Sequence, residues 1–196
     1  MQLLIATTNP GKKKEFISLL ELTGIALTFP DVLGIRMEVE ETGASYVENA
    51  ILKADALSKL SGLPTLADDT GLEVTVLEGR PGLHSARYAG GVANSDQGRR
   101  QELLRELRSF PQPWLARFTC EAAIAIPGQP TRTFHGEVAG EIIQQERGEH
   151  GFGYDRIFFI PALGKTMAEL DLAEKNLYSH RALAVTRALR YLESLL

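Results

Sequence analysis

The acidic pair Asp68-Asp69 constrains the fold of this chain more than any other feature. Pro64-Thr65-Leu66-Ala67 precedes the pair, and Leu72 and Val74 alternate with polar residues after it, which is a strand pattern. Two carboxylates at the end of a buried strand cost desolvation free energy unless a cation or hydrogen-bond donors compensate. The fold must therefore bring such partners to this strand. An acidic turn between strands is the alternative, but apolar flanks on both sides argue against a plain surface loop.

A divalent metal is one partner that would compensate these charges. Mg²⁺ binds carboxylate and phosphate oxygens together, so one aspartate could hold the metal while the other activates a water molecule. A second acidic pair, Glu40-Glu41, precedes Thr42-Gly43 and could line a metal site, although a solvated turn would show the same residues.

Strand and helix patterns interleave along the chain. Asn9-Pro10 is typical of a helix start, and the capping box formed by Ser45 and Glu48 predicts a helix over residues 46–60. The remaining patterns predict strands over residues 2–6, 116–126 and 132–143, a helix over residues 95–109, and a C-terminal helix. This order predicts an α/β fold with a mixed sheet rather than a purely parallel one.

Bulk properties exclude several classes of protein. A chain of 196 residues is long enough for one substantial domain or two small lobes that share a core. The net charge of -4 provides no broad basic field for nucleic acid, and the apolar runs are too short to span a membrane. The single cysteine, Cys120, lies in an apolar run and is expected to be a small buried hydrophobe. Asn9-Pro10 follows the start too closely for a signal peptide, so we expect a cytoplasmic protein.

Three further segments suit a nucleotide. Thr7-Thr8-Asn9-Pro10-Gly11-Lys12 lies between a predicted strand and a helix start, where free N–H groups favour a phosphate, but it is not a Walker loop and an ordinary capped helix would look the same. Gly151-Phe152-Gly153-Tyr154-Asp155 offers aromatic rings that could stack on a base, or an aromatic-anchored turn. Ser179 is a predicted N-cap that places His180 and Arg181 at a helix start, with Lys175 just upstream.

Read together, these segments resemble the inosine triphosphate pyrophosphatase family, which hydrolyses non-standard purine nucleotides. The resemblance runs almost from end to end, and the segments occur in the family's order. It rests on Ala6-Thr7-Thr8-Asn9-Pro10-Gly11-Lys12, Glu40-Glu41-Thr42-Gly43, Glu48-Asn49-Ala50 with Lys53, Leu66-Ala67-Asp68-Asp69-Thr70-Gly71-Leu72, Pro81-Gly82, Ser85-Ala86-Arg87-Tyr88-Ala89-Gly90, Gly151-Phe152-Gly153-Tyr154-Asp155, Ala168-Glu169-Leu170, Glu174-Lys175-Asn176 and Ser179-His180-Arg181.

The resemblance implies an elongated, two-lobed α/β fold with a long central mixed sheet flanked by helices. The active-site cleft would lie between the lobes, and residues 1–196 would form one such domain. It also implies a homodimer that cleaves ITP, dITP or XTP into the monophosphate and pyrophosphate with Mg²⁺, for which Mn²⁺ could substitute.

Roles for single residues follow from the same resemblance. Asp69 would be the general base and a metal ligand, and Glu41, Glu40 and Asp68 would belong to the same acidic metal site. The remaining candidates are substrate contacts, namely Thr7, Thr8, Asn9, Pro10, Gly11, Lys12 and Lys53 for the triphosphate, Thr70 beside the acidic pair, and Phe152, Gly153, Tyr154, Asp155, Lys175, His180 and Arg181 for the nucleobase.

Two positions depart from the family's pattern. Arg156 follows the Phe-Gly-Tyr-Asp segment where proline is common, so the loop could be less rigid or Arg156 could make its own contact. His84 stands where an aromatic residue, often tyrosine, is common. Neither adjoins the acidic pair, so both bear on specificity rather than on the reaction.

Other functions fit parts of the same pattern. A related pyrophosphatase could act on pyrimidine or modified nucleotides, and a regulatory module could bind a nucleotide without cleaving it. Two acidic clusters together with Lys12 argue against binding alone, which would need no carboxylate to activate water. RNA binding is less favoured because the chain is acidic and has no basic stripe.

Overall fold

The computed structural model describes residues 1–36, 39–90 and 95–194, and the chain forms two compact units. Unit 1 comprises Met1–Asp69, Cys120–Gly136 and Ser179–Leu196, and unit 2 comprises Thr70–Thr119 and Glu137–Tyr178. The long strands β3 (Thr65–Val74), β5 (Trp114–Ala125) and β6 (Arg132–Ile142) contribute residues to both units.

The sheet is mixed, as the sequence predicts. Its order is β2-β1-β3-β5-β6-β7-β8, and β4 pairs with β3 off this path. Strand β1 runs parallel to β2 and β3, whereas β4 runs antiparallel to β3, and β7 runs antiparallel to β6 and β8. The strands not yet given bounds are β1 (Gln2–Ile5), β2 (Ala26–Thr28), β4 (Pro81–Gly82), β7 (Phe158–Ile160) and β8 (Lys165–Thr166).

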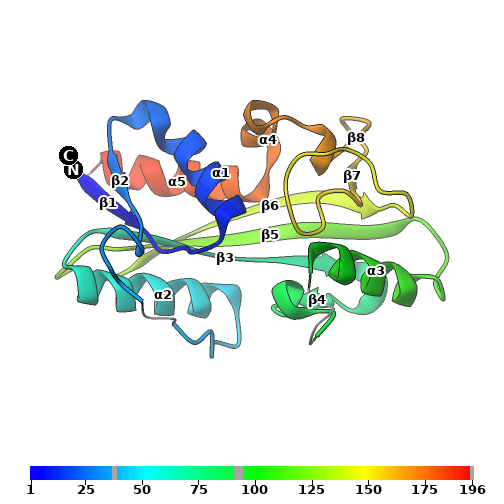
Figure 1. Cartoon of the computed structure of the whole chain (residues 1–196), viewed down its shortest axis with the longest axis horizontal. Coiled ribbons are helices and arrows are strands. Elements are labelled where there is room, and N and C mark those ends of the chain that lie inside the picture. The colour runs from blue at the N-terminus through cyan, green and yellow to red at the C-terminus, as the bar shows by residue number, and fades with distance from the viewer. Residues whose placement is uncertain (37–38, 91–94, 195–196) are drawn as a thin grey trace. The chain divides into compact units, whose positions relative to one another are not determined.

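Helices cover both faces of the sheet in unit 1. Figure 1 shows α1 (Pro10–Leu20) and α5 (His180–Glu193) on one face and α2 (Tyr46–Ser61) on the other. Alternating strand residues supply the two cores: Leu3 and Leu66 pack in the cluster that includes α1 and α5, while Leu4 packs in the cluster that includes α2. Cys120 is buried in the first of these clusters, as expected for a small hydrophobe. A short 3₁₀ helix, η1 (Glu21–Thr23), follows α1.

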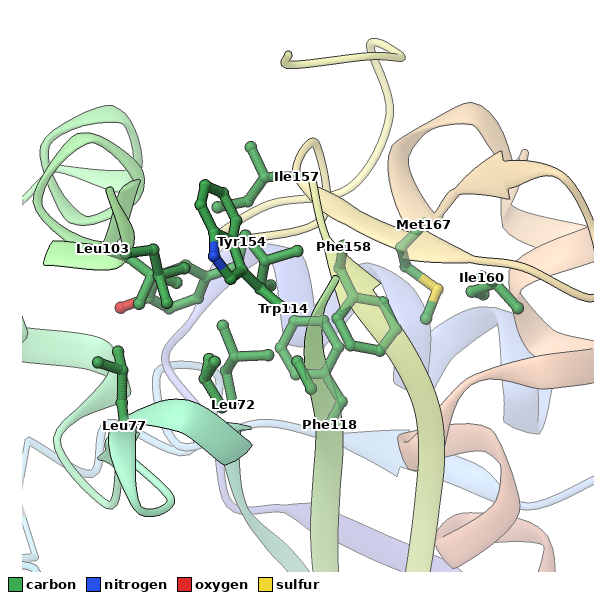
Figure 2. Close-up of a cluster of buried hydrophobic side chains, with 14 of the residues drawn as sticks. Leu72, Leu77, Leu103, Trp114, Phe118, Tyr154, Ile157, Phe158, Ile160 and Met167 are labelled. Carbon is green, nitrogen blue, oxygen red and sulfur yellow. The ribbon is translucent and has the colours of Figure 1, made fainter. Parts of the chain in front are cut away.

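Unit 2 has its own aromatic core, which Figure 2 shows. The Phe118 and Phe158 rings lie 4.6 Å apart between centroids, and Trp114, Tyr154 and Leu103 belong to the same buried cluster. The helices of this unit are η2 (Thr75–Leu77), η3 (Ser85–Arg87), α3 (Asp96–Leu107), η5 (Met167–Glu169) and α4 (Leu172–Tyr178).

Local sequence signals locate the helix starts. The side chains of Asn9, Ser45, Ser95 and Ser179 each cap a helix by accepting a hydrogen bond from a backbone N–H in the first turn. The predicted starts of α1 and α5, and both predicted boundaries of α2, α3, β1, β5 and β6, agree with the observed ones to within two residues.

Strand β3 differs from the sequence expectation. The sequence pattern predicts the acidic pair at the end of a buried strand, followed by a second strand from Leu72 onward. Instead β3 continues without a break from Thr65 to Val74, and residues 75–77 form η2. The strand can pass through two carboxylates because cationic side chains and an amide of unit 1 compensate their charges.

None of the helices in the described ranges has the length and apolar character that a membrane crossing requires.

Candidate active site

The two aspartates of β3 face different layers of unit 1. Consecutive side chains on a strand point to opposite faces of the sheet. Asp68 therefore shares its face with Leu66, which packs in the cluster of α1 and α5, and Asp69 shares its face with Ala67, which packs in the cluster of α2. Both carboxylates are buried, since Asp68 is 2% and Asp69 8% exposed.

Asp68 is the partner of two cations. Its Oδ2 lies 2.8 Å from Lys12 Nζ on α1 and 3.1 Å from Arg181 Nε on α5. Arg181 is itself buried, and its Nη1 donates to Glu15. Burial would raise the pKa of Asp68, but the charges of Lys12 and Arg181 outweigh it and hold that pKa far below the usual range. Asp68 is thus ionised at neutral pH, and its contact with Lys12 holds that lysine at the helix start.

Asp69 has a different environment. Its Oδ1 lies 3.3 Å from Lys53 Nζ, and its Oδ2 accepts a hydrogen bond of 3.1 Å from Asn49 Nδ2. Burial raises the pKa of Asp69, and Glu41 adds to the increase, while Lys53 lowers it. A carboxylate with a raised pKa and partial solvent access is suited to accept a proton from water.

Glu41 approaches the same lysine from a loop. Its Oε1 lies 2.7 Å from Lys53 Nζ. The loop is held by Asn49, whose Oδ1 accepts the Gly43 N–H at 2.8 Å while its Nδ2 donates to Asp69. A Cβ at Gly43 would lie 2.7 Å from Asn49 Oδ1, so this close approach requires glycine. Asn49 therefore ties the acidic loop to the carboxylate on β3.

The segment from Thr7 to Lys12 begins α1 as expected. Asn9 Oδ1 accepts the Lys12 N–H at 3.0 Å, the Asn9 N–H donates to Thr7 Oγ1 at 3.2 Å, and Pro10 occupies the first helical turn. Thr8, Asn9 and Pro10 are exposed, while Thr7 is buried. The positive end of the helix dipole is thus accessible to an anion beside the Lys12–Asp68 pair.

The donor set suits a hard cation at Glu41 and Asp69. Within the described ranges, no three acidic, histidine or cysteine side chains gather as ligands for one metal. Two carboxylates do converge on one cation, because Glu41 Oε1 and Asp69 Oδ1 both contact the Lys53 ammonium. Carboxylate oxygens are the protein ligands that Mg²⁺ and Mn²⁺ prefer, so the ammonium marks a position that a divalent ion fits. Asp68 contacts Lys12 and Arg181, and Glu40 is exposed.

Unit 2 contains the aromatic loop. Asp155 Oδ2 accepts the Phe152 N–H at 2.9 Å and lies 2.5 Å from Lys175 Nζ, which stands 5.2 Å from the centroid of the Phe152 ring. Lys175 and Asp155 are both buried. At Gly151, where φ is +73°, a Cβ would lie 2.0 Å from Asp155 Oδ2. The loop is therefore a folded unit built around one carboxylate.

Helix α3 holds the other side of this loop. The Gly153 N–H donates to Asp96 at 2.7 Å, and Arg100 Nη1 donates to the Gly153 carbonyl at 2.8 Å. Arg100 also forms a two-pronged ion pair with Glu146. A pocket of about 340 Å³ lies beside the loop and is lined by Ser95, Asp96, Gln97, Arg100, Glu149, His150, Gly151, Phe152 and Arg156.

The predicted site residues thus fall into two groups. Unit 1 brings together Lys12, Glu41, Lys53, Asp68, Asp69 and Arg181. Unit 2 brings together Phe152, Asp155 and Lys175, and it buries Tyr154, whose Oη donates to the Ser85 carbonyl at 2.9 Å. Thr70 is half-buried on β3, and His180 is buried at the start of α5.

Several contact residues were not predicted from the sequence. Glu15 follows Lys12 by three positions on α1, and Asn49 precedes Lys53 by four on α2, so helical spacing could have placed each on the same helix face as its neighbour. Arg156, which departs from the family's pattern, makes a contact of its own, with Nη1 3.8 Å from Glu146 Oε2. His84 is exposed.

The chemistry of unit 1 defines a class of site. Ionised carboxylates, lysine ammonium groups and an accessible helix start suit a substrate that carries phosphate groups. The chain belongs to the Ham1 family, whose sequence profile matches residues 3–191. This finding confirms the relationship that the sequence segments indicate.

Known relatives agree with the family profile. The dITP/XTP pyrophosphatase of Bacillus subtilis (strain 168) is 46% identical over 192 residues, which cover 97% of this chain and 96% of the relative. That of Geobacillus kaustophilus is 48% identical over 191 residues, covering 95% and 91%. The Ham1 protein of Staphylococcus aureus has a similar structure, with a TM-score of 0.88 and 39% identity over 100% of both chains. A Ham1 protein from Coxiella burnetii also gives 0.88, with 38% identity over 99% of both chains.

Proposed function

We propose that this chain hydrolyses non-standard purine nucleoside triphosphates, namely ITP, dITP and XTP, to the monophosphate and pyrophosphate. The observation that carries this proposal is the arrangement around Asp69, a carboxylate of raised pKa beside Lys53 and Glu41. The relatives named dITP/XTP pyrophosphatase, at 46% and 48% identity, support this substrate class.

Asp69 acts as the general base. It accepts a proton from the water molecule that attacks phosphorus, and Asn49 keeps its second oxygen in place. A positioned base of this kind contributes roughly 10²–10⁴-fold to a rate. The bond between the α- and β-phosphates breaks, and pyrophosphate leaves.

Cationic groups hold the triphosphate. Lys12 and the exposed N-terminus of α1 bind phosphate oxygens, and Lys53 stabilises the charge that develops on the leaving group. A bound Mg²⁺, or Mn²⁺ in its place, would neutralise further phosphate charge, with Glu41 and Asp69 as its protein ligands. Asp68 is not assigned as a metal ligand, because Lys12 and Arg181 already contact its carboxylate. Glu40 is likewise not assigned as a ligand; it is exposed and directly precedes Glu41.

Recognition of the base is assigned to other residues. Phe152 offers a ring on which a base stacks, and Lys175 and Asp155 provide polar groups beside it. Hypoxanthine and xanthine present a keto oxygen where adenine presents an amino group, so a hydrogen-bond donor favours them. His180 and Arg181 are the proposed donors for this oxygen; the Arg181 contacts described above are with Asp68 and Glu15.

A pyrophosphate-release assay with Mg²⁺ across a nucleotide panel tests the reaction. Release from dITP or XTP much faster than from dATP supports the proposal. Faster release from a pyrimidine or modified nucleotide would assign the chain to a different substrate, and release of single phosphates would reject the reaction. Binding without metal-dependent turnover would instead identify a regulatory module.

Two further expectations belong to the same proposal. We expect a homodimer, which light scattering of the purified chain at several concentrations measures. We also expect a cytoplasmic protein, which cell fractionation tests.

A further inference from the structure

We propose that the Lys53 ammonium occupies the cation position of the substrate-free site and leaves it when a divalent metal binds together with a triphosphate. This inference rests on the proposed function for the identity of the triphosphate. It gives Lys53 two successive sets of partners, first the two carboxylates and then the phosphate oxygens.

The Lys53 ammonium lies between two carboxylates that a metal ion would need as ligands. Lys53 Nζ lies 2.7 Å from Glu41 Oε1 and 3.3 Å from Asp69 Oδ1, and the lysine side chain is 13% exposed. The carboxylate oxygens of Glu41, on its loop, and of Asp69, on β3, thus point at one position. A metal ion of the size of Mg²⁺ sits about 2.0–2.1 Å from its oxygen ligands, so it needs the same oxygens and leaves no room for the ammonium between them.

Electrostatic repulsion prevents the Lys53 ammonium and a divalent metal ion from occupying this position together. Two cations that share the same carboxylate oxygens lie within a few ångströms of each other, and their repulsion is strong in a partly buried site because solvent screens it little. The side chain can give way, since lysine carries its charge on a flexible four-carbon stem. The Lys53 side chain should therefore move away from the carboxylates when a metal ion binds.

The carboxylate on β3 and the acidic loop stay in place after this release. Asn49 donates to Asp69 Oδ2 and accepts the Gly43 N–H, so the link between β3 and the loop does not pass through Lys53. Gly43 and Asn49 pack so closely that even a Cβ would not fit between them. The metal ligands are therefore preorganised, while the cation that balances them is exchangeable.

Binding of metal and triphosphate should consequently be cooperative. Metal alone breaks both lysine contacts and gives Lys53 no new partner. Metal with a triphosphate replaces those contacts with phosphate oxygens. The substrate-free chain should thus bind a divalent ion weakly, and removing the lysine charge should strengthen that binding.

Calorimetric titration of the nucleotide-free protein with Mn²⁺ alone tests this proposal. Lys53→Met should bind Mn²⁺ at least about tenfold more tightly than the wild type, since a tenfold change corresponds to only about 1.4 kcal/mol. Lys59→Met is the matched control, because Lys59 is exposed near the end of the same helix, and its affinity should stay at the wild-type value. Equal or weaker binding by Lys53→Met would overturn the proposal.

A second measurement needs no substitution and so does not depend on the variant folding. Amine acylation of the wild-type chain, read by peptide mass spectrometry, should label Lys53 faster with saturating Mn²⁺ than without it, relative to Lys59. Unchanged or slower labelling of Lys53 would overturn the proposal. Neither readout uses turnover, so failure of the pyrophosphate-release assay would contradict the proposed function alone.

Discussion

Asp68 and Asp69 are adjacent on one strand and yet belong to opposite layers of unit 1. Asp68 faces α1 and α5 and pairs with Arg181, whereas Asp69 faces α2 and accepts a hydrogen bond from Asn49. The surroundings lower the pKa of Asp68 and raise that of Asp69. Two identical side chains thus acquire separate tasks, one electrostatic and one proposed to be chemical.

Substitution of Asp69 should cut turnover by orders of magnitude without unfolding the chain. Asp69→Asn keeps the size of the side chain but removes the proton acceptor, so pyrophosphate release should fall by roughly 10²–10⁴-fold. Thermal unfolding should remain close to wild type, because the variant removes a carboxylate that burial disfavours. Near-normal turnover would place the base elsewhere.

Substitution of Asp68 should mainly lower the stability of the fold. Asp68→Asn leaves two cations, Lys12 and Arg181, without their shared carboxylate in a buried place, which costs about 3 kcal/mol of unfolding free energy. Chemical denaturation measures this loss. Asp31→Asn is the control, because Asp31 pairs with Lys13 on the exposed surface and its loss should change stability little. Equal effects of the two variants would contradict the structural role of Asp68.

The contribution of Asp68 to stability should depend on pH with a definite sign. Its folded pKa lies below its ordinary value of 3.8, so the unfolded chain takes up the proton first as pH falls. The stability gap between wild type and Asp68→Asn should be constant above about pH 5 and shrink below about pH 4. Denaturation curves across this range measure it, and a gap that widened on acidification would contradict the assignment.

Two glycines of the aromatic loop offer a matched comparison. Gly151 and Gly153 both have positive φ, of +73° and +61°, but a Cβ at Gly151 strikes Asp155 Oδ2, whereas one at Gly153 would meet no described atom within 4 Å. Gly153→Ala should cost about 1–2 kcal/mol of backbone strain. Gly151→Ala should cost more and should also raise the KM for the nucleotide, because it displaces Asp155 from Lys175. Thermal unfolding and KM measure both, and identical behaviour would show that the Asp155 contact is unimportant.

Local signals in the sequence were sufficient for the helix starts. Asn9, Ser45 and Ser179 cap helices through hydrogen bonds to residues three positions away. Both partners of each cap therefore lie in one short stretch of sequence, where the pattern can be recognised. Hydrophobic alternation about Phe134, Val138 and Ile142 likewise located β6.

The course of β3 and the partners of its aspartates could not be predicted in this way. A strand continues through Asp68 because Arg181, 113 positions later in the chain, supplies a compensating charge. The link from Arg181 to Glu15 spans 166 positions, and no local pattern reveals such a pairing. The family resemblance indicated which residues matter, but only the alternation of β3 separated the environments of the two aspartates.

The alternation along β3 makes this strand intolerant of changes in length. One residue inserted before the aspartates would move each of them one position along the strand and so to the other face. Asp68 would then take the place of Asp69 beside the lysine of α2, whereas Asp69 would take the place of Thr70, about 6.6 Å beyond the position that the Arg181 guanidinium contacts. Two inserted residues would restore the faces but move the pair along the strand by about 6.6 Å, out of reach of both sets of partners. Point substitutions can repair a lost contact, whereas an altered count of residues between Thr65 and Asp68 has no local remedy. Insertions and deletions should therefore be far more damaging here than in the turn at residues 126–131.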